Sequence, residues 1–311
     1  MQKSVLINCH NRIAPYIHRT PVLTSGILNT LSNADLYFKC ENFQRIGAFK
    51  MRGAINAVLQ LSDQQKKKGV VTHSSGNFAQ ALALASRSLG VKAYIVMPSN
   101  ASSVKKEAVK GYGAEIIECE STLTAREIAA RHIEETEGAT FIHPSNNLEV
   151  IIGQATACME LLEDQPGLDA VIAPVGGGGL IAGTALAAHY FSRKCKTFGG
   201  EPHNADDAYR SLLNGKIENN KTADTIADGL KSYLGDINFP IIKQHVKDII
   251  RVTEDEIISS MKLIWERMKI VVEPSSAVAL AAILKEKEKF KNKKIGIIIS
   301  GGNVDLAELP F

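Results

Sequence analysis

Residues 170–189 read AVIAPVGGGGLIAGTALAAH, in which an apolar strand pattern runs into four consecutive glycines and then into an apolar helix pattern. Four glycines in a row cost backbone entropy, which indicates that bare main chain is needed at this turn. Consecutive amides at a helix start bind anions, and the missing side chains let a phosphate come within hydrogen-bond distance. The stretch therefore predicts a phosphate-binding loop, with a tight helix-on-sheet turn as the structural alternative.

The same run also fits the dinucleotide-binding pattern G-x-G-x-x-A, through Gly177, Gly179 and Ala182. Glu201 closes the next strand pattern about 20 residues later, where such a fold places the acidic residue that binds a ribose. This alternative would make the chain an NAD-dependent oxidoreductase. The glycine loop alone does not separate a phosphate monoester from a pyrophosphate, so other segments must decide.

Strand and helix patterns alternate on both sides of this loop. Short β-branched runs typical of strands occupy residues 69–75, 91–98, 114–120, 139–144, 168–175, 196–201 and 293–300. Helical patterns lie between them at residues 77–90, 102–113, 123–138 and 148–164. This alternation is typical of parallel sheets joined by crossover helices, so we expect an α/β fold.

Composition limits the partners that the chain can have. The 311 residues include 36 basic and 33 acidic side chains, and this near-balance argues against nucleic acid and membrane partners. The five scattered cysteines form no C-x-x-C pair, which favours a reducing, cytoplasmic setting over a disulfide framework or a zinc knuckle. The first residues lack the apolar run of a signal peptide, and no apolar segment is long enough to cross a bilayer. We expect a cytoplasmic protein that acts on a small molecule.

Lys50 stands in the segment GAFKMRGAINAVLQL, where a helical pattern starts near Ala48 or Phe49. A cation at that place faces the positive end of the helix dipole, which lowers the pKa of its ammonium group. A lysine of this kind can form a Schiff base with a carbonyl compound. On its own the signal is weak, because most lysines at helix starts are ordinary surface residues.

Two further strand patterns end in small polar turns. Ser74, Ser75, Gly76 and Asn77 follow one strand and begin a helix, so they either cap that helix or hold a carboxylate or ring hydroxyl. The segment ISGGNVD, residues 299–305, follows the last strand in the same way. Because the carboxyl ends of parallel strands meet at one edge of a sheet, these turns and the glycine loop predict a single cleft.

Six motifs in order resemble the fold-type II pyridoxal-phosphate enzymes, the family that includes serine racemases and serine/threonine dehydratases, with the racemases most similar. They are GAFKMRGA around Lys50, SSGN at 74–77, the glycine loop at 176–179, EPHNADD at 201–207, ADGLKS at 227–232 and SGGNVD at 300–305. The similarity covers nearly the whole chain from HRTPVLTS at 18–25 onward. It implies a two-lobed fold like that of the tryptophan synthase β chain.

The resemblance implies a set of residues that hold pyridoxal 5'-phosphate. Lys50 would carry the internal aldimine, Asn77 would meet the ring hydroxyl and Ser300 the pyridine nitrogen. A neutral hydroxyl stabilises a protonated ring less than a carboxylate does, which favours prompt β-elimination. The full set is Phe49, Lys50, Asn77, Gly176, Gly177, Gly178, Gly179 and Ser300.

The reaction that the resemblance implies begins when an amino acid displaces Lys50, whose free amine then removes the Cα proton. Loss of a β-hydroxyl leads to a 2-oxo acid and ammonia, and a proton delivered by Ser75 on the opposite face leads to racemisation. We expect a serine racemase that also dehydrates serine, threonine or 3-hydroxyaspartate as an ammonia-lyase. A threonine or threo-3-hydroxyaspartate dehydratase without significant racemisation is the alternative, and the oxidoreductase is more remote.

Substrate and metal residues follow from the same resemblance. Ser74, Ser75, Arg126 and Ser232 match substrate positions, and Arg126 could pair with a second carboxylate, which would let 3-hydroxyaspartate compete with serine. The metal candidates are Glu201, the carbonyl of Ala205, and Asp207, whose oxygen ligands suit Mg²⁺, Ca²⁺ or Mn²⁺. From the residues alone, acidic side chains in the first turn of a helix explain this segment as well.

A nucleotide effector such as ATP is also implied, at Gln80, Tyr112, Lys269 and Asn303. Arg45 and Ile46 depart from the Lys-Thr pair that is usual beside that site, which weakens this expectation. Phe78 and Ala48 depart from a histidine and a serine near the substrate and the lysine, so we expect a changed substrate preference with the chemistry retained.

Two lobes and a homodimer are implied as well. The larger, discontinuous lobe would bind the cofactor and comprise residues 1–60 and 148–311. The smaller, mobile lobe would comprise residues 69–146. This division rests on the family resemblance, since composition marks no linker.

Overall fold

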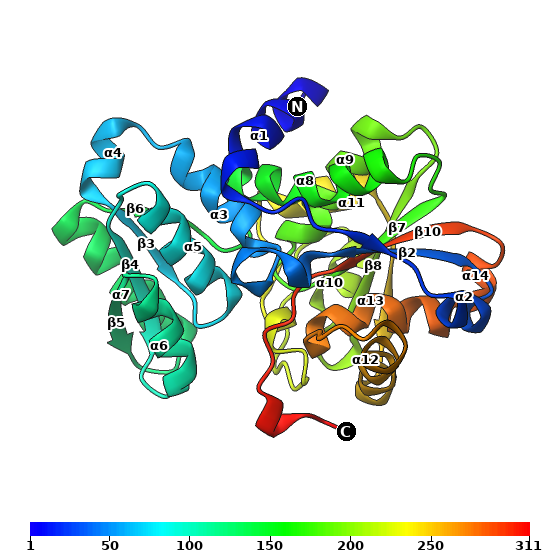
Figure 1. The fold of residues 1–311 in the computed structure, drawn as a ribbon. Helices are drawn as coiled ribbons and strands as arrows, with labels where there is room; N and C mark the ends of the chain where they lie inside the picture. Colours follow the sequence, from blue (N-terminus) through cyan, green and yellow to red (C-terminus); the bar gives the residue numbers. More distant parts are fainter.

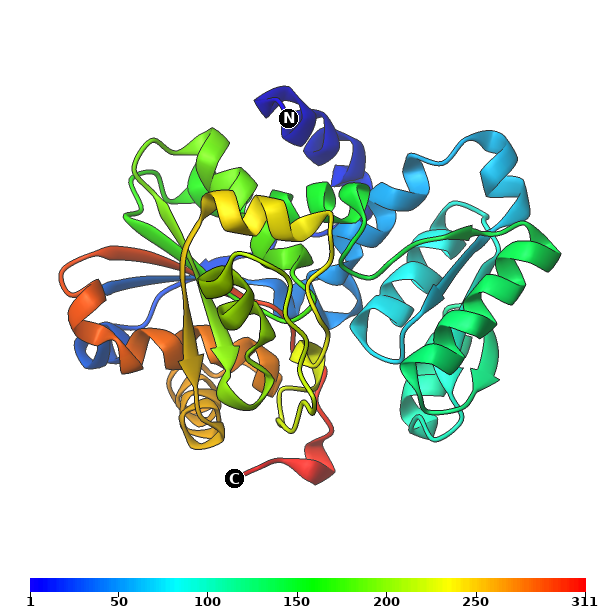
Figure 2. The same cartoon turned by 180° about the vertical axis from the view of Figure 1, so that it is seen from behind.

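The computed structural model describes residues 1–311, apart from the side chain of Val104. It has an α/β fold with two sheets, as expected, and Figures 1 and 2 show the smaller sheet and its helices set beside the larger sheet from two sides. The larger sheet has six strands in the order β1-β2-β10-β7-β8-β9, all parallel except β1. Its strands are β1 (Val22–Leu23), β2 (Asp35–Cys40), β7 (Ala170–Pro174), β8 (Lys196–Pro202), β9 (Val246–Val252) and β10 (Lys294–Ile299).

The smaller sheet has four parallel strands in the order β5-β4-β3-β6. Buried side chains of α5 and of β3 and β4 share one core, and α7 packs on the other face of the sheet over Val71 and Tyr94. The strands are β3 (Val70–His73), β4 (Ala93–Pro98), β5 (Glu115–Cys119) and β6 (Thr140–Phe141). The helices of this part are α4 (Asp63–Lys68), α5 (Asn77–Ser88), α6 (Ser103–Gly111) and α7 (Leu123–Glu137).

Helices cover both faces of the six-stranded sheet. One apolar core joins α1, α3, α8, α9 and α11 to that sheet and continues to α5 and the smaller sheet, and a second core lies under α2, α12 and α13. On the first face lie α1 (Lys3–Ile13), α3 (Lys50–Leu59), α8 (Leu148–Asp164), α9 (Gly179–Phe191) and α11 (Asn238–His245). The others are α2 (Gly26–Ser32), α10 (Asp207–Asn214), α12 (Glu254–Met268), α13 (Pro274–Lys285) and α14 (Lys287–Phe290). None of the described helices combines the length and apolar character needed to cross a membrane.

Glycines bring α3, α8 and α9 into main-chain contact. A Cβ at Gly153 of α8 would lie 2.6 Å from the Cα of Gly53 in α3, and a Cβ at Gly183 of α9 would lie 2.7 Å from the main-chain nitrogen of Ala155. Such approaches are shorter than real Cβ contacts, so larger residues would push the helices apart. The three helices therefore fix the start of α3, at Lys50, relative to the glycine loop before α9.

The seven strand patterns expected from the sequence all contain strands, and the four helical patterns contain α5, α6, α7 and α8. The sequence analysis missed β1, β2 and β9. The segments of β2 (DLYFKC) and β9 (VKDIIRV) mix charged with apolar residues, and β2 continues into Glu41, a charged residue that is fully buried. A charged residue within a short apolar run suggests an exposed segment, so the sequence pattern did not predict β2 and β9 as strands.

Candidate functional site

Lys50 is the first residue of α3, and the end of β10 holds its segment in place. The Phe49 N–H donates to the carbonyl of Ser300 at 2.9 Å, and Ala48 forms an antiparallel bridge with Gly301. The Lys50 ammonium donates to the carbonyl of Pro144 at 3.1 Å and lies 5.0 Å from the centre of the Phe49 ring. Burial lowers the pKa of Lys50 to about 8, although the charge of Glu273 opposes this. An amine with this pKa is a far better nucleophile and base at neutral pH than an exposed lysine.

The glycine loop follows β7 and begins α9. A Cβ at Gly176 would lie 2.7 Å from the Cα of Leu230, and one at Gly177 would lie 2.5 Å from Ser145 Oγ. Gly178 has φ +83°, the left-handed region that favours glycine. Asn238 Nδ2 donates to the Gly177 carbonyl at 2.9 Å, which turns that carbonyl away from the helix start. The first amides of a helix have no acceptor within the helix, so this loop presents donors to an anion.

A polar group lies beside Lys50, at the ends of β10 and β3. The hydroxyls of Ser300 and Ser276 lie 2.9 Å apart, and Ser300 is 3% exposed. Asn77 Nδ2 donates to the carboxylate of Glu273 at 3.0 Å, and Asn303 Nδ2 donates to Asn77 Oδ1 at 2.8 Å. Burial raises the pKa of Glu273 to about 7, although the hydrogen bond from Asn77 opposes this. Two groups with pKa values near neutrality, Lys50 and Glu273, thus flank these hydroxyls and amides, a feature typical of catalytic sites.

Ser74 and Ser75 lie in the turn between β3 and α5, and both are partly exposed. The Ser74 hydroxyl accepts from the Gly76 N–H at 3.4 Å, and Asn77 begins α5. This turn therefore faces the polar group around Glu273 through Asn77. The Glu273 N–H donates to the carbonyl of Gly301 at 3.1 Å, so the turn after β3 and the turn after β10 meet at Glu273, while the expected cleft between the strand ends stays a prediction.

A family model described as pyridoxal-phosphate dependent enzyme matches residues 13–301. The chain belongs to this family of pyridoxal-phosphate dependent enzymes. It is 54% identical over 304 residues to the serine racemase of Dictyostelium discoideum, which covers 96% of this chain and 94% of the relative. It is 48% identical over 306 residues to the beta-hydroxyaspartate dehydratase of Paracoccus denitrificans, which covers 98% and 97%. The solved structure of maize serine racemase superposes with a TM-score of 0.97 at 45% identity, over 99% of this chain and 95% of that one.

These matches give no support to the dinucleotide alternative, and Glu201 supplies a physical reason against it. The carboxylate of Glu201 is fully buried and accepts from the main-chain amides of Ala208 at 2.9 Å and Tyr209 at 2.8 Å. Both of its oxygens are therefore turned to the start of α10. A carboxylate held in this way does not face a ribose.

The residues at the strand ends fit pyridoxal phosphate, the cofactor of this pyridoxal-phosphate dependent family. The glycine loop fits a phosphate through the first main-chain amides of α9, which have no acceptor within the helix. A Cβ at Gly176 or Gly177 would collide with Leu230 or Ser145, so these glycines also serve close packing at the turn. Lys50 has a lowered pKa and no ion pair among the described side chains, as a Schiff-base lysine requires. Ser232 also lies at this loop, because a Cβ at Gly177 would come within 3.3 Å of the Ser232 Cβ.

Arg126 lies on α7, where its Nε donates to the carbonyl of Thr122 at 3.3 Å. Its charge acts together with burial to lower the pKa of His73 at the end of β3. Among the described residues no hydrogen bond links Arg126 to the group around Lys50. Arg126 is therefore near the start of the helix that covers the Val71–Tyr94 face of the small sheet, and its expected contact with the substrate stays a prediction.

Glu201 and Asp207 form a second group of buried carboxylates. Asp207 Oδ1 accepts from Asn220 Nδ2 at 2.7 Å, and the buried Oδ2 has no hydrogen-bond partner. Burial raises the pKa of Asp207 to about 6, and burial together with the charge of Asp207 raises the pKa of Glu201. No cluster of three or more His, Cys, Asp or Glu side chains suited to a metal occurs among the described residues. Of these carboxylate oxygens, only Asp207 Oδ2 is buried without a hydrogen-bond partner, because both Glu201 oxygens accept main-chain amides. A hard cation would therefore bind Asp207 Oδ2 together with main-chain and water oxygens, and Glu201 only through its remaining lone pairs.

The four effector candidates lie on separate elements. Asn303 donates to Asn77 and to the Ile46 carbonyl, so it belongs to the polar group beside Lys50. Lys269 follows α12 with φ 59°, and no hydrogen bond within the described part of the chain joins it to the others. The remaining two are Gln80 on α5 and Tyr112 after α6.

Sequence reasoning missed Glu273 and Ser276 on the large-lobe side of this site, and Ser145 and Asn238 beside the glycine loop. Glu273 comes directly before Pro274 at the start of α13, a pattern that normally marks a helix cap. Only 4% of Glu273 is exposed, which is unusual for a carboxylate without an ion pair. This burial results from the fold, so the sequence does not show it.

Proposed function

We propose that this chain is a serine racemase that also dehydrates serine and related 3-hydroxy amino acids. The observation that carries the proposal is the amine of Lys50, with its pKa near 8. It donates to the carbonyl of Pro144, and the next residue, Ser145, packs against Gly177 of the glycine loop. Relatives that are 54% and 48% identical are named serine racemase and beta-hydroxyaspartate dehydratase, which supports the same reaction class here.

We assign the phosphate of the cofactor to Gly176, Gly177, Gly178 and Gly179, and its ring to Phe49, Asn77 and Ser300. When bound at Lys50, the cofactor withdraws electrons from the Cα of the substrate. Phe49 covers one side of the site next to the Lys50 ammonium. Asn77 and Ser300 supply polar hydrogens and oxygens from opposite lobes, so the substrate site is complete only when the two lobes meet.

Lys50 and Ser75 would do the proton work. The Lys50 amine removes the Cα proton, since its lowered pKa leaves a large neutral fraction at pH 7–8. If the β-hydroxyl then leaves, the products are a 2-oxo acid and ammonia. If Ser75 Oγ delivers a proton on the opposite face, the product is the other enantiomer. Ser74 and Ser232 would bind the substrate beside these groups.

The threonine or threo-3-hydroxyaspartate dehydratase is the second candidate. Its support is the relative named beta-hydroxyaspartate dehydratase and the presence of a cationic side chain, Arg126, in the first turns of α7. An arginine there would pair with the second carboxylate of 3-hydroxyaspartate. The loss of that pairing in Arg126→Gln would lower the rate with 3-hydroxyaspartate more than the rate with serine.

The test is one set of incubations of the purified holoenzyme with L-serine, D-serine, L-threonine and L-threo-3-hydroxyaspartate. Both 2-oxo acid and inverted enantiomer are measured in each. We expect both products from serine, and Ser75→Ala should retain 2-oxo acid formation while it loses inversion. Oxo acid without inversion in the parent enzyme favours the dehydratase, and no product from any substrate contradicts both functions.

Borohydride reduction tests the lysine assignment separately. Peptide mass mapping of the reduced holoenzyme should find the cofactor on Lys50. The matched variant Lys287→Ala changes an exposed lysine of α14 and should leave both the adduct and the activity intact. An adduct on another lysine would overturn the assignment.

A divalent cation, Mg²⁺, Ca²⁺ or Mn²⁺, is proposed at Glu201, Asp207 and the carbonyl of Ala205. The buried, unpartnered Oδ2 of Asp207 supports this assignment. Removal of the cation by a chelator should lower the melting temperature, and Asp207→Asn should abolish that response. An unchanged melting temperature on chelation of the cation-loaded protein counts against the site.

We further propose that residues 69–146 form a small lobe that closes over a large lobe made of residues 1–60 and 148–311. The four-stranded sheet lies wholly within 69–146, and Asn77 and Glu273 bond across the boundary, which supports this division. Small-angle scattering should show a more compact particle when a non-reactive substrate analogue is added to the holoenzyme.

A homodimer is proposed from exposed apolar side chains on one side of the large lobe. Asn42 Nδ2 donates to the carbonyl of Val271, so Phe43 and Val271, each 45% exposed, belong to neighbouring segments. Ile27 on α2 is 53% exposed. Light scattering should give the mass of two chains, and Val271→Asp should shift it toward one.

We also propose a cytoplasmic location, and ATP as an effector at Gln80, Tyr112, Lys269 and Asn303. Titration of the activity with ATP tests the effector.

A further inference from the structure

A cavity of about 700 Å³ opens at the amino-terminal edge of the six-stranded sheet, between the carboxyl ends of α9 and α11. Lys196 and Lys247 lie at or near the first residues of β8 and β9, and both line it. The glycine loop and Ser300 follow β7 and β10, so they lie at the opposite edge of the sheet. Because α9 connects the two places over 13 residues, they are about 20 Å apart. The cavity is separate from the cofactor site.

The cavity carries a surplus of positive charge. Among the lining residues that the structure describes there are five Lys and Arg side chains and no Asp or Glu: Lys3, Arg193, Lys194, Lys196 and Lys247. Lys194 is neutralised by Asp169 at 2.8 Å, and the Lys3 ammonium lies over the Phe191 ring at 4.6 Å. The carboxyl ends of α9 and α11 contribute about half a negative charge each. Of the four lysine and arginine charges that have no carboxylate partner, the two helix ends together offset about one. About three positive charges therefore remain unbalanced.

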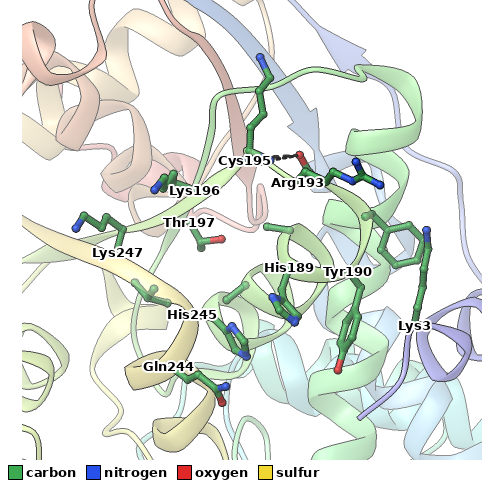
Figure 3. Close-up of a pocket in the computed structure, with 16 residues that line it drawn as sticks. Lys3, His189, Tyr190, Arg193, Cys195, Lys196, Thr197, Gln244, His245 and Lys247 are labelled. Atoms are coloured by element: carbon green, nitrogen blue, oxygen red, sulfur yellow. Dashed lines mark hydrogen bonds between the residues drawn. The ribbon is translucent and has the colours of Figure 1, made fainter.

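Two imidazoles form the floor between these cations. The rings of His189 and His245 lie 4.5 Å apart with an angle of 39° between them, and both line the cavity. Figure 3 shows them at the centre of the cavity, with Lys196 and Lys247 on one side and Lys3 and Arg193 on the other. Imidazole and ammonium groups are hydrogen-bond donors to phosphate and carboxylate oxygens. Cations from α1, the end of α9, β8 and β9 thus lie around the two imidazoles, and the exposed side chains of Lys196, Lys247 and Arg193 extend away from them (Figure 3).

We propose that this cavity binds a small polyvalent anion, a molecule with several phosphate or carboxylate groups. A monovalent anion would leave most of the surplus charge in place, whereas three or more anionic groups match it in number and in spread. The volume lies within the range of about 300–1,000 Å³ that is usual for small-molecule sites. Lys196, Lys247 and Arg193 are exposed, so they are free to turn toward such a ligand.

Titration calorimetry of the holoenzyme with inorganic tripolyphosphate tests this site. Bound cofactor keeps the glycine loop filled, and buffer without divalent cations prevents chelation by the probe. Ionic strength is held constant with KCl. We expect saturable binding of one tripolyphosphate per chain, and the double variant Lys196→Gln/Lys247→Gln should weaken it at least about tenfold through two lost charge-assisted contacts.

Two matched variants separate this site from the alternatives. Lys287→Gln and Lys291→Gln each remove an exposed lysine that lines neither the cavity nor the proposed effector site. Both should bind tripolyphosphate as the parent does, and the titrations are made with the proposed effector site filled by saturating ATP. Parent-like binding by the double variant, an equal loss in either control, or no binding by the parent would each overturn the proposal. A parallel titration with citrate shows whether carboxylates serve as well as phosphates. The readout is binding, so it does not depend on the racemase or dehydratase activity.

Discussion

Lys50 and Arg52 lie two residues apart at the start of α3, and each belongs to a group of buried charges. The two groups differ in how their charges are paired. Arg52 is fully buried and donates to Glu41 at 2.7 Å and to Glu160 at 2.8 Å, while Lys39 lies 2.7 Å from Glu160. Burial alone would raise the pKa of Glu160, but hydrogen bonds from His10 and Arg52 hold it well below its usual range. Two cations and two carboxylates balance, so every charge in this network is fixed.

Lys50 and Glu273 form the other group, and neither has a close partner of opposite charge among the described side chains. Burial lowers the pKa of Lys50 to about 8 and raises that of Glu273 to about 7. Both groups can therefore gain or lose a proton at physiological pH. Ion pairing thus fixes the charges of the Arg52 network, while the two groups without an ion pair keep pKa values near neutrality, as groups that transfer protons do.

The largest expected effect is on activity at the group without ion pairs. Lys50→Ala removes the nucleophile and the base, so kcat for 2-oxo acid formation should fall by about 10⁴-fold or more. At pH 7 the apoenzyme should lose no stability and can gain about 3 kcal/mol, because folding no longer buries an amine whose pKa falls from 10.5 to about 8 and only one hydrogen bond to a carbonyl is lost. Activity assays and urea titrations check the two quantities. A large loss of stability with retained activity would reverse the comparison.

The paired network should show the opposite result. Arg52→Met leaves Glu41 and Glu160 buried without their arginine, so the free energy of unfolding should fall by about 3–5 kcal/mol in urea titrations. Arg19→Met is the matched control, because Arg19 pairs with Glu163 and Asp164 while 48% of its side chain is exposed. Its loss should cost about 1 kcal/mol or less. If both variants lower the free energy of unfolding by the same amount, the buried ion pairs of Arg52 contribute no more to stability than the exposed ones of Arg19.

The sequence pointed to Lys50 in one of these groups and missed its partner Glu273 as well as the whole paired network. The glycine loop stands out as a local pattern, whereas Lys50, a weak signal alone, and Ser300 were predicted through the resemblance to pyridoxal-phosphate enzymes. Arg52 and Glu160 lie 108 residues apart, and each reads as an ordinary surface charge. Only the packing of α3 against α8 buries them, and packing between distant segments has no local signal.

The same reason explains what was missed inside the site. Glu273 and Asn77 are 196 residues apart, and the pattern around Glu273 reads as a helix start with Pro274. Glu201 was predicted as a metal ligand or a ribose ligand, and its hydrogen bonds to the start of α10 were not visible in sequence. Local motifs therefore predict where a site should lie, while the polar contacts between these segments become visible only in the fold.

The pH dependence of stability can sharpen the comparison further. The pKa of Glu273 rises from 4.5 to about 7 in the folded protein. The folded carboxyl then keeps a proton that the unfolded chain releases, so stability falls as pH rises from about 4.5 to 7. The cost, on the order of 3 kcal/mol, is complete above pH 7. Lys50 and Asp228 face this carboxyl, and the Lys50 shift, from 10.5 to about 8, acts above this window.

Glu273→Gln apoenzyme should lack this loss of stability. Urea titrations at pH 5 and pH 8 should show parent protein losing stability between them and the variant losing less. Glu288→Gln, at a side chain that is 73% exposed, is the control and should follow the parent. If the variant loses as much stability between pH 5 and pH 8 as the parent, the Glu273 carboxyl is ionised over this whole range. Glu273 would then be a fixed charge, like the carboxylates of the Arg52 network.

The smallest effect is expected at the rim of the paired network. His10 Nε2 bonds to Glu160 at 3.1 Å, but Glu160 also keeps Arg52 and Lys39 within 2.8 Å, so His10→Ala leaves no carboxylate unpaired. The free energy of unfolding should fall by about 1 kcal/mol or less, the value of one partly exposed hydrogen bond, and kcat should not change. Urea titrations beside Arg52→Met measure the difference. If His10→Ala lowers the free energy of unfolding as much as Arg52→Met does, Arg52 and Lys39 alone do not neutralise the two carboxylates. One partly exposed hydrogen bond from His10 would then contribute as much to stability as a buried ion pair.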